Sequence, residues 1–512
     1  MLVKTFGAAV QGINATIVTI EVNVGQGIRF LHVGLPDNAV RESHERIASA
    51  FGCCGYSMPH RQIVINMAPA DIRKEGSAYD LSLAVGILAA DDKIKRDLLE
   101  KYLIMGELSL DGGLQPIKGV LPIAIKAREE GFKGFILPRQ NAREAAVVNN
   151  LDIFGVENIK EVIDFFDGKS ELEPTLVNTR EEFYSKVNLS EIDFSDVKGQ
   201  ENVKRALEVA AAGGHNIIMV GPPGAGKSML AKRLPTILPP LSLQEALETT
   251  KIHSVAGNID NNTSLISQRP FRSPHHTISD VALVGGGAFP QPGEISLAHN
   301  GVLFLDELPE FKRTVLEVMR QPLEDRKICI SRAKFSIEYP ASFMLVASMN
   351  PCPCGYYNHP DRECVCGPGV VQKYLSRISG PLLDRIDIHI EIIPVPFEKL
   401  SEMTEAESSE IVRNRVIKAR QIQEERFKDV EGVYCNAQMS TKQMRTYAAT
   451  DKASIELLKN AMSRLNLSAR AYDRIIKVAR TIADLDDSEN ILSNHIAEAI
   501  NYRNLDREGW AG

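Results

Sequence analysis

Apolar and polar residues alternate along the first part of the chain, as they do in half-buried strands. The alternation runs twice over residues 14–35, as ATIVTIEVNV and IRFLHVGL, and Gly25-Gln26-Gly27 between the two runs predicts the turn of a hairpin. A helical period over 39–51, strand alternation over 62–68 and an apolar helical stretch over 79–90 follow. A second hairpin is predicted in YLIMGELSLDGGLQPI, and helix and strand patterns then alternate to about Gly168. These elements predict one α+β domain over residues 1–170.

The hydrophobic pattern changes beyond residue 170. Residues 171–193 are polar, and Pro174 breaks any helix, which predicts a linker. Residues 194–396 alternate between helix and strand, which is typical of a parallel α/β sheet, and residues 397–512 predict a helical lid domain. The chain is therefore expected to be a multidomain α/β protein. The predicted elements are helices 201–212 and 227–237, strands 216–220, 302–305 and 343–347, and helices near 405–427, 441–450, 452–465, 469–483 and 493–502.

Composition and charge narrow the class of protein. Hydrophobic residues make up 44% and charged residues 24% of the 512 residues, which excludes a disordered or fibrous chain. The formal net charge is −7, so any nucleic-acid site has to be local. The most apolar stretch, residues 81–90, is about half of what spans a bilayer, and the first residues lack the apolar run of a secretion signal. We expect a cytoplasmic protein without membrane association.

One segment of the α/β region has the pattern of a phosphate-binding loop. GPPGAGKS fits G-x-x-x-x-G-K-[ST] in full and lies between the strand NIIMV and a predicted helix. The loop amides and the helix N-terminus can then converge on the phosphates of ATP, while Lys227 reaches the β and γ phosphates and Ser228 holds Mg²⁺. The predicted ATP-binding residues are Gly221, Pro222, Pro223, Gly224, Ala225, Gly226, Lys227 and Ser228.

A buried strand followed by two carboxylates predicts the hydrolytic element. In GVLFLDE, Asp306 is placed to hold Mg²⁺ through water, and Glu307 is placed to polarise the attacking water. The strand FMLVA leads in the same way to Asn350, whose amide is expected beside the γ-phosphate as a sensor. These catalytic candidates favour hydrolysis of ATP over binding alone.

Two arginines are candidates for acting on the nucleotide. Arg385 lies just before the strand IDIHIEI, where it can stabilise transition-state charge in the active site of a neighbouring subunit. The alternative for Arg385 is an ordinary ion pair with Asp384 or Asp387. Arg470 begins a helix and can reach back to the nucleotide, and its alternative is a solvated helix end.

Four of the eight cysteines lie within fifteen residues, in a C-x-C-x₉-C-x-C pattern. Four thiolates in one loop can hold a tetrahedral Zn²⁺, although C-x₂-C is the usual spacing and C-x-C is tighter. His359 can replace one ligand. An Fe–S cluster and redox-active or free thiols are the alternatives. The candidate metal ligands are Cys352, Cys354, Cys364 and Cys366.

Two basic segments lie between the motifs of the predicted ATP site. RPFRSPHH carries Arg269 and Arg272, and the glycine-rich stretch 285–290 that follows fits a loop projecting into a pore. Residues 326–339 alternate as a hairpin whose tip carries Arg332 and Lys334. These cations can grip DNA phosphates without reading sequence. The alternative for Arg272 and the histidine pair is a structural role at a subunit interface.

With these residues in place, the chain resembles the magnesium-chelatase-like AAA+ ATPases of the YifB/ComM family over nearly its whole length. The segments that carry the resemblance are GPPGAGKS, RPFRSPHHTIS, AHNGVLFLDELPEF, MNPCPCG, RISGPLLDRIDIHIE and LSARAYDRIIKVARTIADL. The resemblance implies a homohexameric ring in which Arg385 is the arginine finger and Arg470 the second sensor. It also implies a DNA helicase that drives branch migration during homologous recombination in natural transformation. Family members occur in many bacteria, so the transformation role need not extend to each of them.

The N-terminal region resembles the proteolytic domain of Lon through MGELSLDGGLQPIKGVLPIAIKAREEGFKGFILP. The Lon family needs a Ser nucleophile and a Lys base. Here Ala78 stands where the Ser is expected, and Leu121 lies near the position of the Lys. Ser77 is one position away and Lys118 three, so we expect no proteolytic dyad.

Three function classes follow from the sequence. The first is a DNA motor, the second is a chelatase-type ATPase that remodels a protein partner, and the third is an ATP-dependent scaffold that does not translocate. A Lon-like domain and a cysteine cluster beside the sensor favour the motor over the chelatase subunit. Whether DNA stimulates ATP hydrolysis is the observation that separates the DNA motor from the other two classes.

Overall fold

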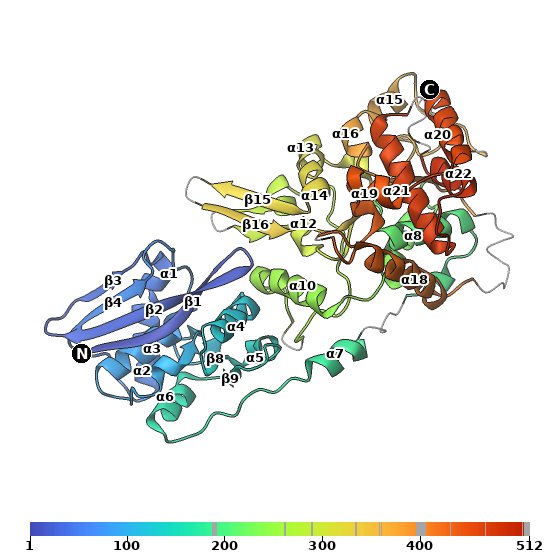
Figure 1. Ribbon diagram of the computed structural model, residues 1–512. Coiled ribbons are helices and arrows are strands. Elements are labelled where there is room, and N and C mark those ends of the chain that lie inside the picture. Colours follow the sequence, from blue (N-terminus) through green and yellow to red (C-terminus); the bar gives the residue numbers. More distant parts are fainter. Residues whose placement is uncertain are drawn as a thin grey trace.

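The computed structural model describes residues 1–186, 192–260, 263–287, 290–332, 335–357, 359, 361–395, 406–430, 432–465, 467–503 and 505 (Figure 1). Two large sheets organise these residues, with seven strands in the N-terminal part and five in the part that follows. Helices pack against both sheets, and the C-terminal part is helical. The predicted mixed α/β class is confirmed. The domain boundaries at 170, 193 and 396 stay predictions.

The N-terminal sheet has the strand order β3-β4-β2-β1-β5-β8-β9. The first two strands form a long antiparallel hairpin whose register runs from Leu2↔Asn23 to Gln11↔Asn14. The third strand pairs in parallel with β4, and β4 pairs with β2. The strands are β1 (Leu2–Gln11), β2 (Asn14–Gly25), β3 (Phe30–Val33), β4 (Gln62–Ala68), β5 (Tyr102–Ile104), β8 (Gly134–Pro138) and β9 (Asp152–Val156).

The predicted hairpin over residues 14–35 is therefore wrong in its pairing. Strand β4 buries Ile63, Ile65 and Met67 and fits the place beside β2, whereas the four-residue β3 buries none of its side chains fully and fits the edge of the sheet. On the other side of β2, strand β1 pairs with it along all of β1, from Leu2 to Gln11. Alternation alone identifies a strand but does not choose its neighbour.

Six helices cover the N-terminal sheet. The apolar stretch predicted as a helix forms α3, in which every residue is buried, because it packs between the sheet and α2. The hairpin predicted at Asp111-Gly112-Gly113 is confirmed as β6 (Glu107–Leu108) and β7 (Leu114–Gln115). The helices are α1 (Asn38–Arg41), α2 (Ser43–Cys53), α3 (Asp80–Ala90), α4 (Val120–Glu129), α5 (Arg139–Ala145) and α6 (Ile159–Asp167).

The second sheet is parallel, with the order β11-β14-β17-β10-β18. Since its strands are parallel, their carboxyl ends meet at one edge, which is where ligands bind in such sheets. The strands predicted at 216–220, 302–305, 343–347 and in IDIHIEI are confirmed. The strands are β10 (Ile217–Val220), β11 (Phe271–Arg272), β14 (Val302–Leu305), β17 (Met344–Met349) and β18 (Ile388–Glu391).

The C-terminal helices share one hydrophobic core with this sheet. Helices α18 and α21 pack against α8 (Glu201–Gly213), and their apolar residues form one cluster with strands β10 and β14. The five predicted helical segments are confirmed. They are α18 (Ser409–Phe427), α19 (Thr441–Tyr447), α20 (Lys452–Arg464), α21 (Ala469–Leu485) and α22 (Ser493–Asn501).

A buried polar cluster also ties the helical part to the sheet. Arg474 on α21 donates to Asp387 at 2.8 Å, and His215 lies 3.3 Å from Asp387 and 2.8 Å from Thr481. Burial lowers the pKa of His215, which favours the neutral ring. Burial alone would raise the pKa of Asp387, but Arg474 and His215 hold it well below the ordinary value. Asp387 is therefore a charged anchor inside the protein.

Helix α10 (Leu243–Ala256) connects the two halves of the molecule. It belongs in sequence to the second half, yet it packs against α4 of the first half (Figure 1). The backbone N–H of Gly119 donates to the carbonyl of Ser254 at 3.0 Å, and the N–H of Leu121 donates to the Ser254 hydroxyl at 3.3 Å. Ala246 lies in the N-terminal core.

A second contact joins the halves at the tip of the β1–β2 hairpin. A Cβ added at Gly12 would meet Ile337 at 3.0 Å, and Ile13 packs in the cluster that contains Tyr339. Both partners belong to the hairpin of β15 (Lys327–Arg332) and β16 (Phe335–Pro340), which confirms the hairpin predicted over 326–339.

The predicted linker contains a helix in its described part. Residues 171–178 have no regular structure, and α7 (Thr179–Lys186) follows Pro174. Among the residues that the structure describes, no helix has both the length and the apolar character needed to cross a membrane.

Candidate nucleotide site

The phosphate loop joins β10 to α9 (Lys227–Ile237) at the carboxyl edge of the second sheet. Gly224 and Gly226 have φ values of 79° and 86°, which side chains rarely adopt, and a Cβ on Gly221 would lie 2.6 Å from the carbonyl of Ile392. Gly226 caps the N-terminus of α9. The glycines therefore hold the loop in the conformation that turns its amides toward a bound anion.

Lys227 lies folded within its own loop. Its ammonium group donates to the carbonyls of Gly221 at 2.7 Å and Pro222 at 2.9 Å, and to the Oδ1 of Asn350 at 3.0 Å. Burial lowers the pKa of Lys227, while Asp306 and Glu307 act in the opposite direction. The predicted phosphate ligand and the predicted sensor are therefore in direct contact.

Ser228 and Asp306 meet at the place predicted for Mg²⁺. The Ser228 hydroxyl donates to the Oδ2 of Asp306 at 2.7 Å. On the other side, the hydroxyl of Ser348 donates to the Oδ1 of Asp306. Since β14 lies beside β17, Ser348 orients the carboxylate that Ser228 approaches. The alternation of the strand did not indicate this role of Ser348.

Glu307 follows Asp306 in a left-handed backbone conformation, with φ of 54°. Its side chain is 56% exposed, and its Oε2 lies 3.6 Å from the Nδ1 of His276. Tyr374 on α15 (Val370–Leu375) also lies near this carboxylate. Burial raises the pKa of Tyr374 to about 12, and the charges of Glu310 and Glu307 add to this effect.

The two arginines predicted to act on the nucleotide have protein partners within the chain. Arg385 is buried, forms an ion pair with Glu324 at 2.6 Å and donates to the carbonyl of Pro381 at 2.6 Å. Arg470 is 65% exposed and lies 3.3 Å from Asp384. The partner of Arg385 is thus neither of the neighbouring aspartates considered from the sequence, and the roles of both arginines stay predictions.

The four clustered cysteines come together beside the nucleotide site. Their sulfur atoms all lie within 4.8 Å of one another, with Cys352 and Cys354 separated by 3.2 Å and Cys352 and Cys364 by 3.7 Å. The ring of His359 makes a different contact, because its Nδ1 accepts a hydrogen bond from the backbone N–H of Asp361. The sequence spacing therefore predicted a real four-sulfur cluster.

The loop of this cluster touches the phosphate loop. A Cβ added at Gly355, which has φ of 86°, would lie 2.5 Å from the Cδ of Pro223. Gly355 also donates its N–H to the carbonyl of Cys352 at 2.9 Å. The backbone of the cysteine loop at Gly355 therefore packs against the ring of Pro223 in the phosphate loop, and no side chain fits between them.

The basic residues predicted to contact DNA differ in their surroundings. Arg269 pairs with Glu245 at 3.2 Å and donates to the carbonyls of Pro239 and Asn300, and its side chain is 15% exposed. Arg272 makes a two-pronged ion pair with Glu294 at 2.6 and 2.7 Å. Both guanidinium groups thus have intramolecular partners, and they would have to break these ion pairs in order to contact DNA.

The hairpin tip is described only in part. Arg332 ends β15 opposite Phe335, and Lys334 lies outside the described residues. The β15–β16 hairpin extends from the second half toward the side of the N-terminal sheet (Figure 1). The predicted DNA contact of the tip stays a prediction.

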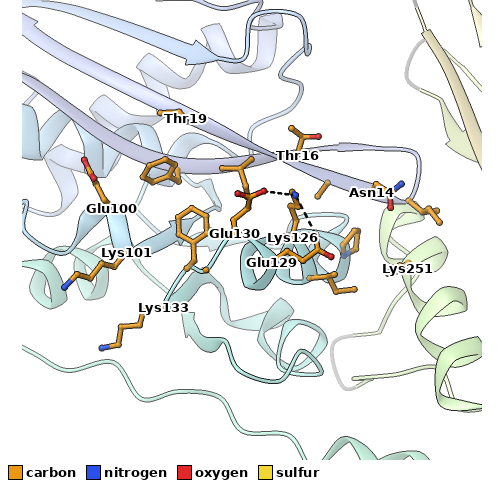
Figure 2. Close-up of a pocket in the computed structure, with 18 residues that line it drawn as sticks. Asn14, Thr16, Thr19, Glu100, Lys101, Lys126, Glu129, Glu130, Lys133 and Lys251 are labelled. Carbon is orange, nitrogen blue, oxygen red and sulfur yellow. Dashed lines mark ion pairs between the residues drawn. The ribbon is translucent and has the colours of Figure 1, made fainter.

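A large cavity lies elsewhere, between the β1–β2 hairpin, α4 and α10 (Figure 2). Its volume is about 1130 Å³, and on its α4 wall Lys126 pairs with Glu129 and Glu130 one turn further along the chain. Lys251 of α10 lines it on the far side. None of the predicted site residues contributes to its wall, so it is separate from the nucleotide site.

The positions predicted from the Lon resemblance carry no paired nucleophile and base. The Ser77 hydroxyl donates to Glu107, Ala78 packs against the N-terminal core, and Leu121 is fully buried beside Ser254. The backbone N–H of Leu121 is shared between the Glu144 carboxylate at 3.1 Å and the Ser254 hydroxyl of the second half at 3.3 Å.

Comparison with known proteins gives three matches to magnesium-chelatase families. Residues 193–400 match the family described as magnesium chelatase, subunit ChlI, residues 20–141 match subunit ChlI of Mg-chelatase, and residues 406–503 match the ChlI C-terminal family. Together they span the N-terminal part, the nucleotide site and the C-terminal helices.

Individual relatives match over nearly the full length. The competence protein ComM of Haemophilus influenzae is 42% identical over 508 residues, which cover 99% of this chain and 98% of the relative. The YifB protein of Salmonella typhimurium is 43% identical over 501 residues, 98% of this chain and 96% of the relative. Lon protease 2 of Bacillus subtilis is 33% identical over 159 residues, which cover 28% of this chain and 27% of the relative.

Proposed function

Because the chain belongs to the YifB/ComM family of magnesium-chelatase-like AAA+ ATPases, we propose that it hydrolyses ATP at the edge of its second sheet and uses the energy to move DNA. The observation that carries the proposal is the convergence of Lys227, Ser228, Asp306 and Asn350 from three neighbouring elements. These groups match the parts that phosphoryl transfer needs, namely a phosphate ligand, metal ligands and a sensor.

The residues present fit a magnesium ion and a nucleotide. A hydroxyl and a carboxylate oxygen 2.7 Å apart, on Ser228 and Asp306, are the oxygen donors that Mg²⁺ prefers. The metal, when bound with ATP, neutralises negative charge on the β and γ phosphates. Ser348 fixes the Asp306 carboxylate, Lys227 exchanges its loop carbonyls for phosphate oxygens, and Glu307 accepts a proton from the attacking water.

The proposed assembly is a homohexameric ring. In this arrangement Arg385 leaves Glu324 and stabilises the transition state in a neighbouring subunit, and Arg470 contacts the nucleotide from the helical part of the chain. A ring also multiplies each basic segment, which lets a chain of net charge −7 concentrate positive charge on an axis.

The proposed substrate is DNA, gripped by the β15–β16 hairpin, and the proposed role is a helicase that drives branch migration in recombination or natural transformation. Arg332 and Lys334 at the hairpin tip supply the phosphate contacts. The alternative is a chelatase-type ATPase that remodels a protein partner, and the experiment below distinguishes the two.

Replacing both Arg332 and Lys334 with Ala is expected to abolish stimulation of ATP turnover by forked DNA and to slow unwinding by at least about tenfold. The salt dependence of DNA binding becomes flatter, since phosphate contacts are lost. The matched control is Lys327→Ala, at the base of the same hairpin, where the ammonium pairs with Glu338 at 3.0 Å. Unwinding at the wild-type rate by the double variant would show that the hairpin is structural. If the wild type neither binds DNA nor responds to it, the remodelling alternative takes its place.

We further propose that the four-cysteine cluster binds one Zn²⁺. Zinc–sulfur bonds of about 2.3 Å in a tetrahedron place the sulfur atoms about 3.8 Å apart. The observed separations of 3.2, 3.7 and 3.6 Å are close to this spacing. An all-sulfur donor set also favours Zn²⁺ over Mg²⁺ or Ca²⁺. The ion would fix the loop that carries Gly355 against Pro223.

Protein purified without chelator is expected to contain about one zinc per chain. Cys364→Ser removes one of the four ligands, so the zinc content falls to near zero, whereas Cys53→Ser, an exposed cysteine outside the cluster, leaves it unchanged. Elemental analysis of both variants measures this. Iron with acid-labile sulfide in the wild type would instead favour an Fe–S cluster, and the absence of any metal would reject the assignment.

A further inference from the structure

A second pocket begins two residues after Glu307. Its volume is about 440 Å³, and it lies between residues 309–313 and residues 373–377 at the end of α15. Its wall contains three basic side chains, Arg313, Lys373 and Arg377, and among the described residues that line it Glu310 is the one carboxylate. The wall therefore has an excess of two positive charges, although the whole chain has a net charge of −7.

Two of the three cations keep their charge available for a ligand. Arg377 pairs with Glu310 at 3.0 Å and donates to the carbonyl of Pro309 at 3.3 Å, so the carboxylate of the wall already has a partner. Arg313 and Lys373 are exposed, and within the described ranges of the chain neither side chain forms an ion pair or a hydrogen bond. An anion that enters the pocket can therefore bind both of them without breaking an existing contact.

The acidic side chain next to Arg313 on its own helix does not neutralise it. Glu317 lies four positions after Arg313 on α13 (Arg313–Val318), but its ion pair is with Arg320, at 2.6 Å. The hydrogen bond from Arg320 is the largest cause of the lowered pKa of the Glu317 carboxyl, and the charge of Arg313 is the smallest. The guanidinium of Arg313 is thus left to the pocket.

The pocket is separate from the nucleotide site. Lys373 and Arg377 are four positions apart across the end of α15, which brings their side chains to one side, and both line the pocket. Tyr374 is buried instead and contacts the backbone of Asn350, which follows β17 at the nucleotide edge. None of the described residues that line the pocket belongs to the phosphate loop or to the proposed metal ligands. Both sites can therefore be filled at the same time.

The charge and the donor groups of the pocket favour phosphate as the ligand. Guanidinium and ammonium groups bind phosphate oxygens through charge-assisted hydrogen bonds. Two excess positive charges match one terminal phosphate or two successive phosphodiester groups. A single carboxylate would leave one of the two cations without a partner.

We propose that this pocket is a phosphate-binding site, in which Arg313 and Lys373 supply the unpaired charges and Arg377 completes the wall. The phosphate can come from two sources, the backbone of a DNA strand or a free phosphate compound such as a second nucleotide. The DNA source rests on the proposed function of moving DNA, whereas the free source does not depend on it. With DNA as the source, the pocket is a second contact to the strand besides the hairpin tip.

Replacing both Arg313 and Lys373 with Ala tests the site with two probes on the full chain. The first probe is a fluorescein-labelled oligo(dT) strand, whose binding is followed by anisotropy over a range of salt concentrations. The second is inorganic pyrophosphate, whose binding is measured by calorimetry after a non-hydrolysable ATP analogue has filled the phosphate loop. The double variant is expected to bind at least one probe about tenfold more weakly, as expected for the loss of charge-assisted hydrogen bonds. Turnover of ATP without DNA stays within about twofold of the wild type, since both residues are exposed and lie outside the nucleotide site.

Three further variants control for net charge and for folding. Lys452→Ala combined with Lys459→Ala removes two exposed lysines of α20 and hence the same net charge, and it is expected to change the binding of either probe by less than about twofold. Arg313→Lys combined with Lys373→Arg retains both charges and restores most of the binding. Lys373→Gln alone removes one charge and keeps a long side chain, so it loses part of the binding. Light scattering and thermal unfolding compare ring size and stability across the set.

The outcomes separate this inference from the proposed function. Weaker binding of DNA alone identifies the DNA backbone as the source of the phosphate, weaker binding of pyrophosphate alone identifies a free phosphate compound, and weaker binding of both supports both sources. Unchanged binding of both probes, or an equal loss in the α20 control, would overturn the site and leave the proposed function in place if the wild type responds to DNA. A wild type that binds no DNA, but loses pyrophosphate binding in the double variant, would retain the site and refute the DNA function.

Discussion

Replacing Glu307 with Gln is expected to preserve ATP binding and to lower turnover by at least about 100-fold, the usual contribution of a general base. The two functions separate because different atoms carry them. In the proposed site, binding depends on Lys227, the loop amides and the pair formed by Ser228 and Asp306, and the hydrogen bonds described for these side chains do not involve the Glu307 side chain. Fluorescent-nucleotide binding and steady-state phosphate release measure the two quantities on the same sample.

A matched control for this variant is Glu310→Gln. Glu310 lies three positions away and pairs with Arg377 at 3.0 Å, so it carries the same charge without facing the metal ligands. Turnover within about twofold of the wild type is expected, since exposed ion pairs contribute little. Comparable turnover in Glu307→Gln and Glu310→Gln would disprove the assignment of Glu307 as the base.

Replacing Arg385 with Ala is expected to lower turnover by about a thousandfold, which is the smaller effect known for an arginine that stabilises a transferring phosphoryl group. If Arg385 acts in a neighbouring subunit, mixing this variant with Lys227→Ala restores part of the activity. Mixed rings contain interfaces at which an intact Arg385 faces an intact phosphate loop. Titration of one variant into the other, with ring size checked by light scattering, measures the restoration.

The ion pair between Arg385 and Glu324 supplies the control. Glu324→Gln removes the partner at 2.6 Å but retains the arginine, so its turnover is expected to stay well above that of Arg385→Ala. If Glu324→Gln and Arg385→Ala lose activity equally and mixing restores none, Arg385 serves the fold of its own subunit and not a neighbouring site.

The nucleotide site could be predicted from the sequence wherever its chemistry is contiguous along the chain. The phosphate loop, the Asp306-Glu307 pair and the four cysteines each lie in one short segment, and the structure brings each set together. Contacts that depend on which strands are neighbours were not visible. Ser348 meets Asp306 because β17 lies beside β14, and His276 meets Glu307 because β11 lies on its other side.

The same distinction holds for the fold. Long amphipathic helices such as α18 and α21 repeat their apolar period often enough to be predicted within a few residues. The short helices of the core region contain four to six residues each, which is too few to show a period, and none was predicted. They are α11 (Asp280–Val284), α12 (Glu294–Leu297), α13 (Arg313–Val318), α14 (Arg320–Asp325), α15 and α16 (Gly380–Leu383).

Ion-paired arginines show a further limit of charge patterns. Arg269 and Arg272 look like exposed positive charge in the sequence, yet Glu245 and Glu294 neutralise them from helices that begin more than twenty residues away. An acidic partner at that distance cannot be recognised without the fold. A basic motif therefore indicates nucleic acid only where its charges remain unpaired.

The contact between the β1–β2 tip and the β15–β16 hairpin is a second attachment of the N-terminal half to the rest of the chain. Gly12 and Ile13 lie against Ile337 and the cluster around Tyr339, while α10 fixes the same half to the ATPase core near Leu121. Two separate attachments resist rotation of the N-terminal half relative to the second half better than a single attachment does. The N-terminal half can thus act as a brace that sets the angle of the β15–β16 hairpin relative to the second sheet.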